Sequence, residues 1–272
     1  MFKNTYQNES PKTYFGGIIW VSLIFILSIL GSLKVGIIFK EKTVTSPESI
    51  TDLILSLVIF GIFILIFNIV RIFKKDFSIF KGIVFYTTIF WGSLLSLNFF
   101  FPDIFSLMIF LSLFFGYLTN RKVWIHNILT VLGFTGIAGM IGFSFPPIVV
   151  FTFLFIFALY IKGKNLYENE EKHNNVFGLI IPRNNSELKE DLKKTTKQYI
   201  IAQAGIFLLP GMLCASVAPV SIERAVIIGI FATFGFIVSS YLFSFEKKCS
   251  CQGIVMTVFF STAFGYLITM LF

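Results

Sequence analysis

Nine apolar runs, each close to the length that crosses a membrane, constrain this chain more than any motif does. A helix needs about 20 mostly apolar residues to span the hydrocarbon core. The runs occupy approximately residues 15–37, 51–73, 78–99, 104–119, 122–142, 145–161, 199–219, 222–245 and 253–272. They are too long and too continuously apolar for the alternating strands of an outer-membrane barrel. The sequence therefore predicts an all-α integral membrane protein with nine transmembrane helices, located in the cell membrane.

The composition excludes an ordinary water-soluble globule. Of the 272 residues, 56% are hydrophobic and 13% charged, whereas soluble domains carry about 25% charged residues. A net charge of +8 would suit nucleic acid, but the bases lie between the apolar runs and form no single patch. We therefore expect membrane lipids as partners and no binding of nucleic acid.

The distribution of Lys and Arg predicts the direction of the chain, because cytoplasmic loops are enriched in both. With nine spans, the 22 Lys and Arg residues divide unevenly between the two sides of the membrane. The side with fewer of them holds Lys34, Lys40, Lys42 and Arg224. The N-terminus is then cytoplasmic and the C-terminus outside. The long polar segment 162–198 is predicted to be a cytoplasmic loop with a short amphipathic helix at 186–199. It divides a six-helix part, 1–161, from a three-helix part, 199–272.

Prolines and small residues predict how some helices meet. Tight hairpins carrying Pro are expected at 101–103 and 143–147. Pro210, inside the seventh run, predicts a kink, which is tolerated where protein or water satisfies the freed carbonyls. Glycines recur every three residues in the fifth run and predict close helix packing; they are Gly133, Gly136, Gly139 and Gly142.

Few polar residues remain as candidates for chemistry. His126, next to Asn127 at the start of the fifth run, could be a ligand or proton carrier, but an interfacial His bonded to a neighbouring helix is the favoured interpretation. Gln203 and Thr257 are interpreted as groups that hydrogen-bond between helices. A second set of residues, Cys249, Cys251 and His173, lacks the paired spacing of a zinc site. We expect no metal and no cofactor.

Three stretches resemble the presenilin-type intramembrane aspartyl proteases, above all their archaeal homologues. The stretch "KVWIHNILTVLGFTGIAGMIGFSFPPIVVFTFLFIFALY", ending at Tyr160, is similar to the fifth and sixth helices of that family, where a His-Asn start and a Pro-containing hairpin lead to Tyr-Asp. The stretch "AGIFLLPGMLCASVA" is similar to the seventh helix, and "TAFGYLITMLF" to the end of the ninth. The resemblance covers about 122–272 and implies a presenilin-like bundle.

The chain departs from the family where the chemistry is done. Family members cut peptide bonds with two aspartates, which share a proton so that one carboxyl acts as base and the other as acid. Aligning the motifs puts these positions at Ile161 and Ile206, and neither side chain can transfer a proton. The Pro-Ala-Leu element at the start of the ninth helix is absent from 251–260. The resemblance therefore implies no catalytic residue and an inactive homologue, a pseudoprotease.

We predict a protein that binds a transmembrane segment or a partner subunit in the cavity between its sixth, seventh and ninth helices. The candidate lining residues are Tyr160, Gln203, Gly205, Pro210 and Met256. One alternative is an active protease that uses other groups or is completed by a partner chain. A small-molecule or ion transporter is less favoured, because no charged residue falls in the middle of a span.

Overall fold

The computed structural model describes residues 12–38, 77–120, 122–163, 178–182, 199–203, 205–244 and 251–271. This part of the chain is mostly helical. Its helices are α1 (Lys12–Ile38), α3 (Phe77–Phe100), α4 (Asp103–Asn120), α5 (Val123–Ser144), α6 (Pro147–Gly163), α7 (Gly205–Val217), α8 (Ile222–Ser244) and α9 (Cys251–Thr269). The predicted span at 51–73 lies outside the described residues, so the count of nine and the direction of the termini stay predictions.

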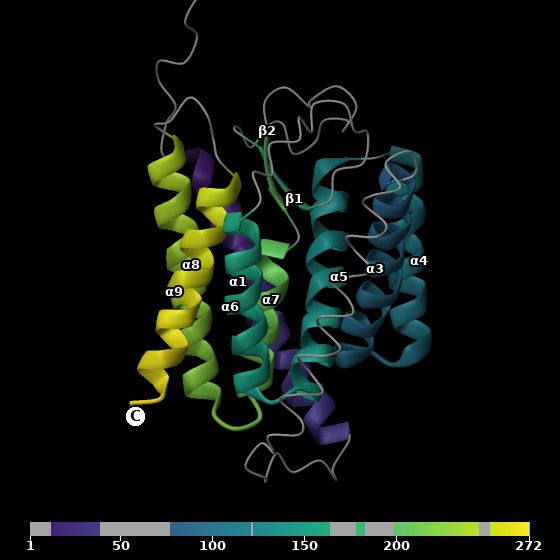
Figure 1. Ribbon diagram of the computed structural model, residues 1–272. Coiled ribbons are helices and arrows are strands. Elements are labelled where there is room, and N and C mark those ends of the chain that lie inside the picture. The colour runs from purple at the N-terminus through teal and green to yellow at the C-terminus, as the bar shows by residue number, and fades with distance from the viewer. Residues whose placement is uncertain are drawn as a thin grey trace, which may run out of the picture.

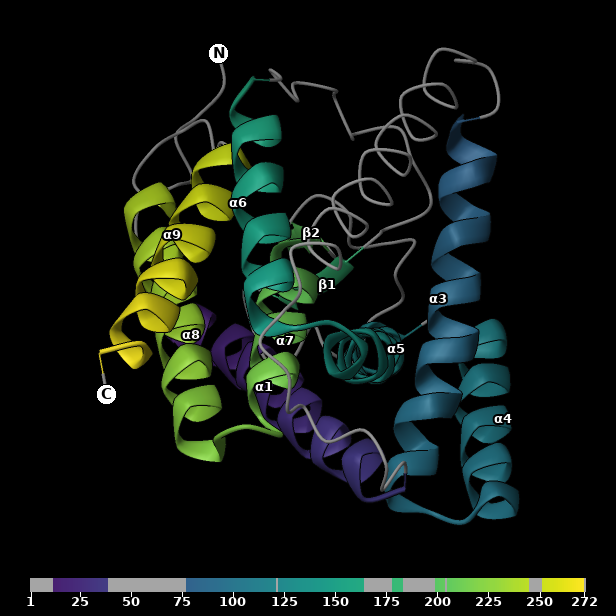
Figure 2. The ribbon, with the colours of Figure 1, turned by 60° about the horizontal axis from the view of Figure 1, so that its bottom comes forward.

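Four of the described helices are long and apolar enough to cross a membrane by length and composition. They are Gly17–Ile37, Asp103–Asn120, Val123–Ser144 and Ile222–Tyr241. In Figure 1 the helices run between the two ends of the bundle, and Figure 2 shows that they cross at angles, because α5 is seen end-on where α3 and α6 are seen from the side. The chain is a helical membrane protein, as its apolar runs predict.

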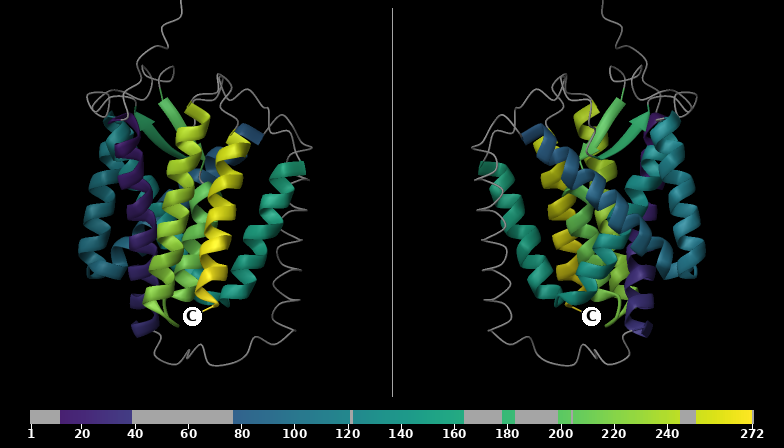
Figure 3. Two further views of the ribbon diagram at one scale, coloured as in Figure 1. Left: turned by 90° about the vertical axis from the view of Figure 1, so that its left-hand side faces the viewer. Right: turned by 90° about the vertical axis from the view of Figure 1, so that its right-hand side faces the viewer.

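The bundle has two sides that meet at α5. Helices α3 and α4 lie on one side of α5, whereas α6, α8 and α9 lie on the other (Figure 2). Helix α5 packs against α3, α1 and α7, and α9 packs against both α8 and α6. Figure 3 shows α9 between α6 and α8, with the sheet beside one end of the helices. Two buried apolar clusters fill the two sides, one around Phe207, Leu213 and Phe259, the other around Phe110 and Leu129.

The expected hairpins are present. Helix α3 ends at Phe100 and α4 begins at Asp103, and α5 ends at Ser144 before α6 begins at Pro147. Pro147 is the first residue of its helix, where a missing N–H costs no hydrogen bond. The N–H of Phe145 donates to the carbonyl of Gly142 at 3.3 Å and closes the end of α5. Both turns are confirmed.

Glycines bring α5 into backbone contact with its neighbours, as predicted. A Cβ on Gly136 would lie 1.9 Å from the carbonyl oxygen of Gly92 in α3, and a Cβ on Gly92 would lie 2.0 Å from that of Gly133. A Cβ on Gly142 would lie 2.5 Å from the carbonyl oxygen of Met212 in α7. Any side chain at these positions would force the helices apart.

A two-stranded sheet corrects the prediction of an all-α fold. Strand β1 (Gly178–Pro182) pairs antiparallel with β2 (Tyr199–Gln203), in a register that sets Gly178 opposite Gln203. The seventh apolar run therefore begins as a strand, and its helix α7 begins only at Gly205. Both strands carry consecutive Ile residues, whose branched side chains favour strands. The prediction of an amphipathic helix at 186–199 is wrong at Tyr199, because this residue begins β2. The other residues of that range lie outside the described residues.

Candidate functional site

The candidate site is framed by α6, α7 and α9. Helix α6 contacts α7 and α9, and α7 also contacts α9. Aromatic pairs join α6 to α9 at two levels: the ring centroids of Phe157 and Phe259 lie 6.0 Å apart, and those of Phe151 and Tyr266 lie 5.0 Å apart. The expected arrangement of these helices is confirmed, whereas the cavity between them stays a prediction.

The two positions aligned with the family aspartates lie at the same end of neighbouring helices. Ile161 belongs to the last turn of α6, and Ile206 to the first turn of α7. Ile206 is 2% exposed and belongs to the large apolar cluster. The side chain of Ile161 lies outside the described residues. Because α6, α7 and α9 contain no Asp or Glu, these three helices offer no carboxyl group at any depth.

The five candidate lining residues lie on four elements, α6, β2, α7 and α9. Tyr160 lies in the last turn of α6, Gln203 ends β2, and Gly205 begins α7; the side chains of Tyr160 and Gln203 lie outside the described residues. Pro210 is buried inside α7, and Met256 of α9 is partly buried against the large apolar cluster. The structure thus brings these elements together and leaves the contact of any ligand with these residues untested.

Helix α5 holds the sheet through its His-Asn pair. The amide nitrogen Nδ2 of Asn127 donates to the carbonyl of Ile180 at 2.7 Å, and the N–H of Ile180 donates to Oδ1 of Asn127 at 2.9 Å. His126 Nε2 donates to the carbonyl of Gly178 at 2.9 Å. His126 and Asn127 are fully or almost fully buried. The favoured interpretation of His126, a bond to a neighbouring helix, is corrected: its partner is a strand.

These bonds determine which edge of the sheet bonds to α5 and which edge does not. In an antiparallel ladder, the N–H and C=O of one residue point to the same side and alternate along the strand. Because Ile180 directs its N–H and C=O toward α5, Leu179 and Ile181 direct theirs toward β2. In β2, Tyr199, Ile201 and Gln203 then direct their N–H and C=O away from β1. The sheet therefore has one edge held by α5 and one edge that faces away from it.

Other polar predictions have mixed outcomes. Thr257 donates to the carbonyl of Gly253, 2.9 Å away in the same helix, so its predicted role between helices is wrong; a Thr in a helix readily bonds four residues back. Bonds between helices come instead from serines that were not singled out, Ser32 to Ala215 and Ser93 to Leu129. Cys249 and His173 lie outside the described residues. Within the described ranges, no group of His, Cys, Asp and Glu could hold a metal ion.

The fold defines a class, the helical membrane bundles, and in this one α6, α7 and α9 contact one another. Within that class, the chain is similar to the structure of a presenilin family intramembrane aspartate protease, with a TM-score of 0.56 and 13% identity. The match covers 93% of this chain and 98% of that one, well beyond the segment 122–272. No protein-family model and no curated protein sequence matches. The fold is therefore presenilin-like.

Proposed function

We propose that this chain binds a transmembrane segment of another membrane protein and does not cut it. The observation that carries the proposal is the absence of carboxyl groups from α6, α7 and α9, which contact one another and contain no Asp or Glu. An aspartyl mechanism needs two carboxyls at one depth. Ile206 is aliphatic and buried in the large apolar cluster, so at this position the side chain supports packing between helices and no proton transfer.

The sheet supports a second contact with the bound segment. A peptide that leaves its helix at the membrane surface can add to an open sheet edge through main-chain hydrogen bonds. The edge of β2 that carries Ile201 directs its N–H and C=O away from β1, and β2 leads within two residues into α7. The expected client therefore has one apolar span and a short extended stretch, rich in branched residues, on the side where the sheet lies.

Binding and cleavage are measured together to test this proposal. The purified chain in lipid nanodiscs is titrated with a fluorescent single-span peptide that active presenilin homologues cut, and anisotropy and mass spectrometry follow the same sample. Saturable binding without fragments is expected. Absence of binding would overturn the proposal. Peptide fragments whose formation is blocked by an aspartyl-protease inhibitor would show instead that the chain is an active protease.

A variant at the edge separates strand addition from packing in the bundle. Ile201→Pro removes an N–H that points away from β1, so it breaks no bond between β1 and β2. We expect it to weaken peptide binding about tenfold, the effect of about one or two hydrogen bonds. Ile201→Val is the matched control and retains binding. Equal affinity of the two variants would show that the edge is not used.

A further inference from the structure

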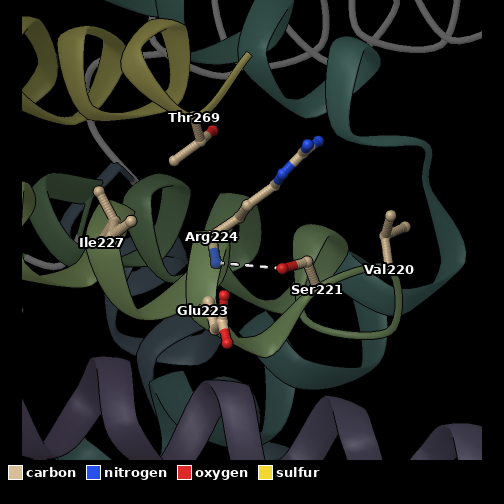
Figure 4. A pocket seen from close by; sticks show the side chains of 6 residues that line it. All are labelled: Val220, Ser221, Glu223, Arg224, Ile227 and Thr269. Carbon is tan, nitrogen blue, oxygen red and sulfur yellow. Dashed lines mark hydrogen bonds between the residues drawn. The ribbon is translucent and has the colours of Figure 1, made fainter. Parts of the chain in front are cut away.

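A hollow lies at the end of the bundle opposite the sheet, between the start of α8 and the end of α9. Its volume is about 570 Å³, and it is lined by Val220, Ser221, Glu223, Arg224, Ile227 and Thr269. Val220 and Ser221 line it from the turn that joins α7 to α8, and Thr269 lines it from α9 (Figure 4). We propose that this hollow binds the phosphate of a membrane-lipid headgroup, with Arg224 as its main contact.

Arg224 is the cation of the site. Its side chain extends from α8 into the hollow, whereas the carboxylate of Glu223 points in a different direction (Figure 4). Asp103 and Glu223 are the carboxylate residues that the described ranges contain, and Asp103 lies on α4, across the bundle (Figure 1). Within those ranges the guanidinium thus has no carboxylate partner. A guanidinium binds phosphate oxygens through two parallel N–H bonds.

Ser221, which precedes the first turn of α8, supplies a further donor. The Oγ of Ser221 accepts the N–H of Arg224 at 3.3 Å, which leaves the hydroxyl proton of Ser221 to donate to a ligand. The first N–H groups of a helix lack carbonyl partners and attract anions. Thr269 donates its hydroxyl proton to the carbonyl of Tyr266 at 2.6 Å, so it lines the hollow without donating to it.

The surroundings favour a lipid as the source of the phosphate. Exposed apolar residues lie in or next to the lining segments: Val220 lines the hollow, Ile222 follows Ser221 in the chain, and Leu271, two residues after Thr269, is 82% exposed. A cation beside exposed apolar residues at the ends of two spanning helices matches the boundary between headgroups and acyl chains. Acyl chains would cover the apolar residues while the headgroup phosphate lies against Arg224. Arg224 is also one of the few bases on the predicted outer side, where the topology rule disfavours them.

Retention of lipid by the intact chain tests the proposal. The purified protein is mixed with phosphatidylglycerol, with a glycosyl-diacylglycerol that lacks phosphate, or with inorganic phosphate, and bound molecules are counted by native mass spectrometry. We expect phosphatidylglycerol to be retained and the other two to be lost. Inorganic phosphate that binds and displaces the lipid would show a soluble-phosphate site instead. Equal retention of the glycolipid would show that the phosphate is not recognised.

Variants assign the binding to this hollow. Arg224→Gln is expected to weaken retention of phosphatidylglycerol about tenfold, because it removes charged hydrogen bonds, with no change in thermal stability. Arg224→Lys keeps the charge but loses the bidentate contact. Its retention of phosphatidylglycerol is expected to lie between that of the unchanged protein and that of Arg224→Gln. Lys34→Gln, which removes an exposed base of α1 on the same predicted side, is the matched control. Equal losses for Lys34→Gln and Arg224→Gln would overturn the proposal.

Discussion

Helices α4 and α5 follow each other in the chain and have the same mean hydropathy, 1.5, yet they meet different surroundings. The apolar window of α4 is 17% buried inside the protein, whereas that of α5 is 61% buried. Helix α4 exposes large side chains such as Ile104, Phe105 and Phe115. Helix α5 carries the glycines, the buried threonines and the His-Asn pair. Apolarity therefore predicts that a helix enters the membrane and says little about whether it faces lipid.

The physical reason is that lipid tails are as apolar as leucine. Within a membrane, helices associate through close packing and hydrogen bonds, and no hydrophobic effect separates an outward from an inward face. Small residues allow α5 to approach α3 and α7, and polar groups bond it to β1. The following substitutions test this contrast between a helix that faces lipid and one that faces protein.

The largest effect is expected for Gly136→Val in α5. Its Cβ would lie 1.9 Å from the carbonyl oxygen of Gly92, so α3 and α5 must separate, at a cost of about 3 kcal/mol or more. Thermal unfolding in detergent and size-exclusion chromatography measure the loss. Gly116→Ala in α4 is the control, because its Cβ would meet Ile125 at an ordinary 3.7 Å. Equal losses of stability for Gly136→Val and Gly116→Ala would show that α5 is not packed more tightly than α4.

Asn127→Leu is expected to be the next most damaging change. It removes both bonds to Ile180 and leaves buried main-chain groups without partners, at a cost of about 2 kcal/mol. Hydrogen exchange of residues 178–182 should rise while the helices keep their protection. Thr119→Ala, whose hydroxyl is exposed and bonds within α4, should leave that exchange unchanged. Unchanged exchange in Asn127→Leu would show that the pair does not hold the sheet.

Ser93→Ala tests a single bond between α3 and α5. The hydroxyl of Ser93 donates to the carbonyl of Leu129 at 3.1 Å, and such bonds in membrane bundles contribute about 0.6 kcal/mol. We expect a fall in the unfolding midpoint that is measurable but much smaller than for Gly136→Val. Ser112→Ala, at an exposed position of α4, provides the baseline. A fall no larger than this baseline would mean that the bond adds nothing.

The smallest effect is expected for Ile104→Val at the start of α4. Ile104 is 74% exposed, so losing one methylene group leaves no cavity and should change the free energy of unfolding by less than about 0.5 kcal/mol. The same change at buried Ile89 of α3, which is 1% exposed, should cost about 1 kcal/mol. Chemical unfolding of the two variants side by side measures the difference, and equal costs would mean that α4 is covered by protein.

Much of the fold follows from local patterns in the sequence. The helices match apolar runs, the hairpins match prolines at 102 and 147, and the close approach of α5 matches its glycines. The sheet was missed because the apolar run 199–219 continues without a break from strand to helix, and a short apolar stretch has no period that separates the two. The partners of Asn127 and Ser32 were missed because they lie more than 50 residues away in the chain.

The sequence by itself determined that this is a helical membrane protein and that α6, α7 and α9 contain no carboxyl group, because both depend only on which side chains are present. The tertiary structure alone decided which helices are buried within the bundle, which strand α5 holds and where the guanidinium of Arg224 extends. Those features depend on contacts between distant segments. Among side chains of equal hydropathy, size and hydrogen-bonding partners decide which ones make such contacts.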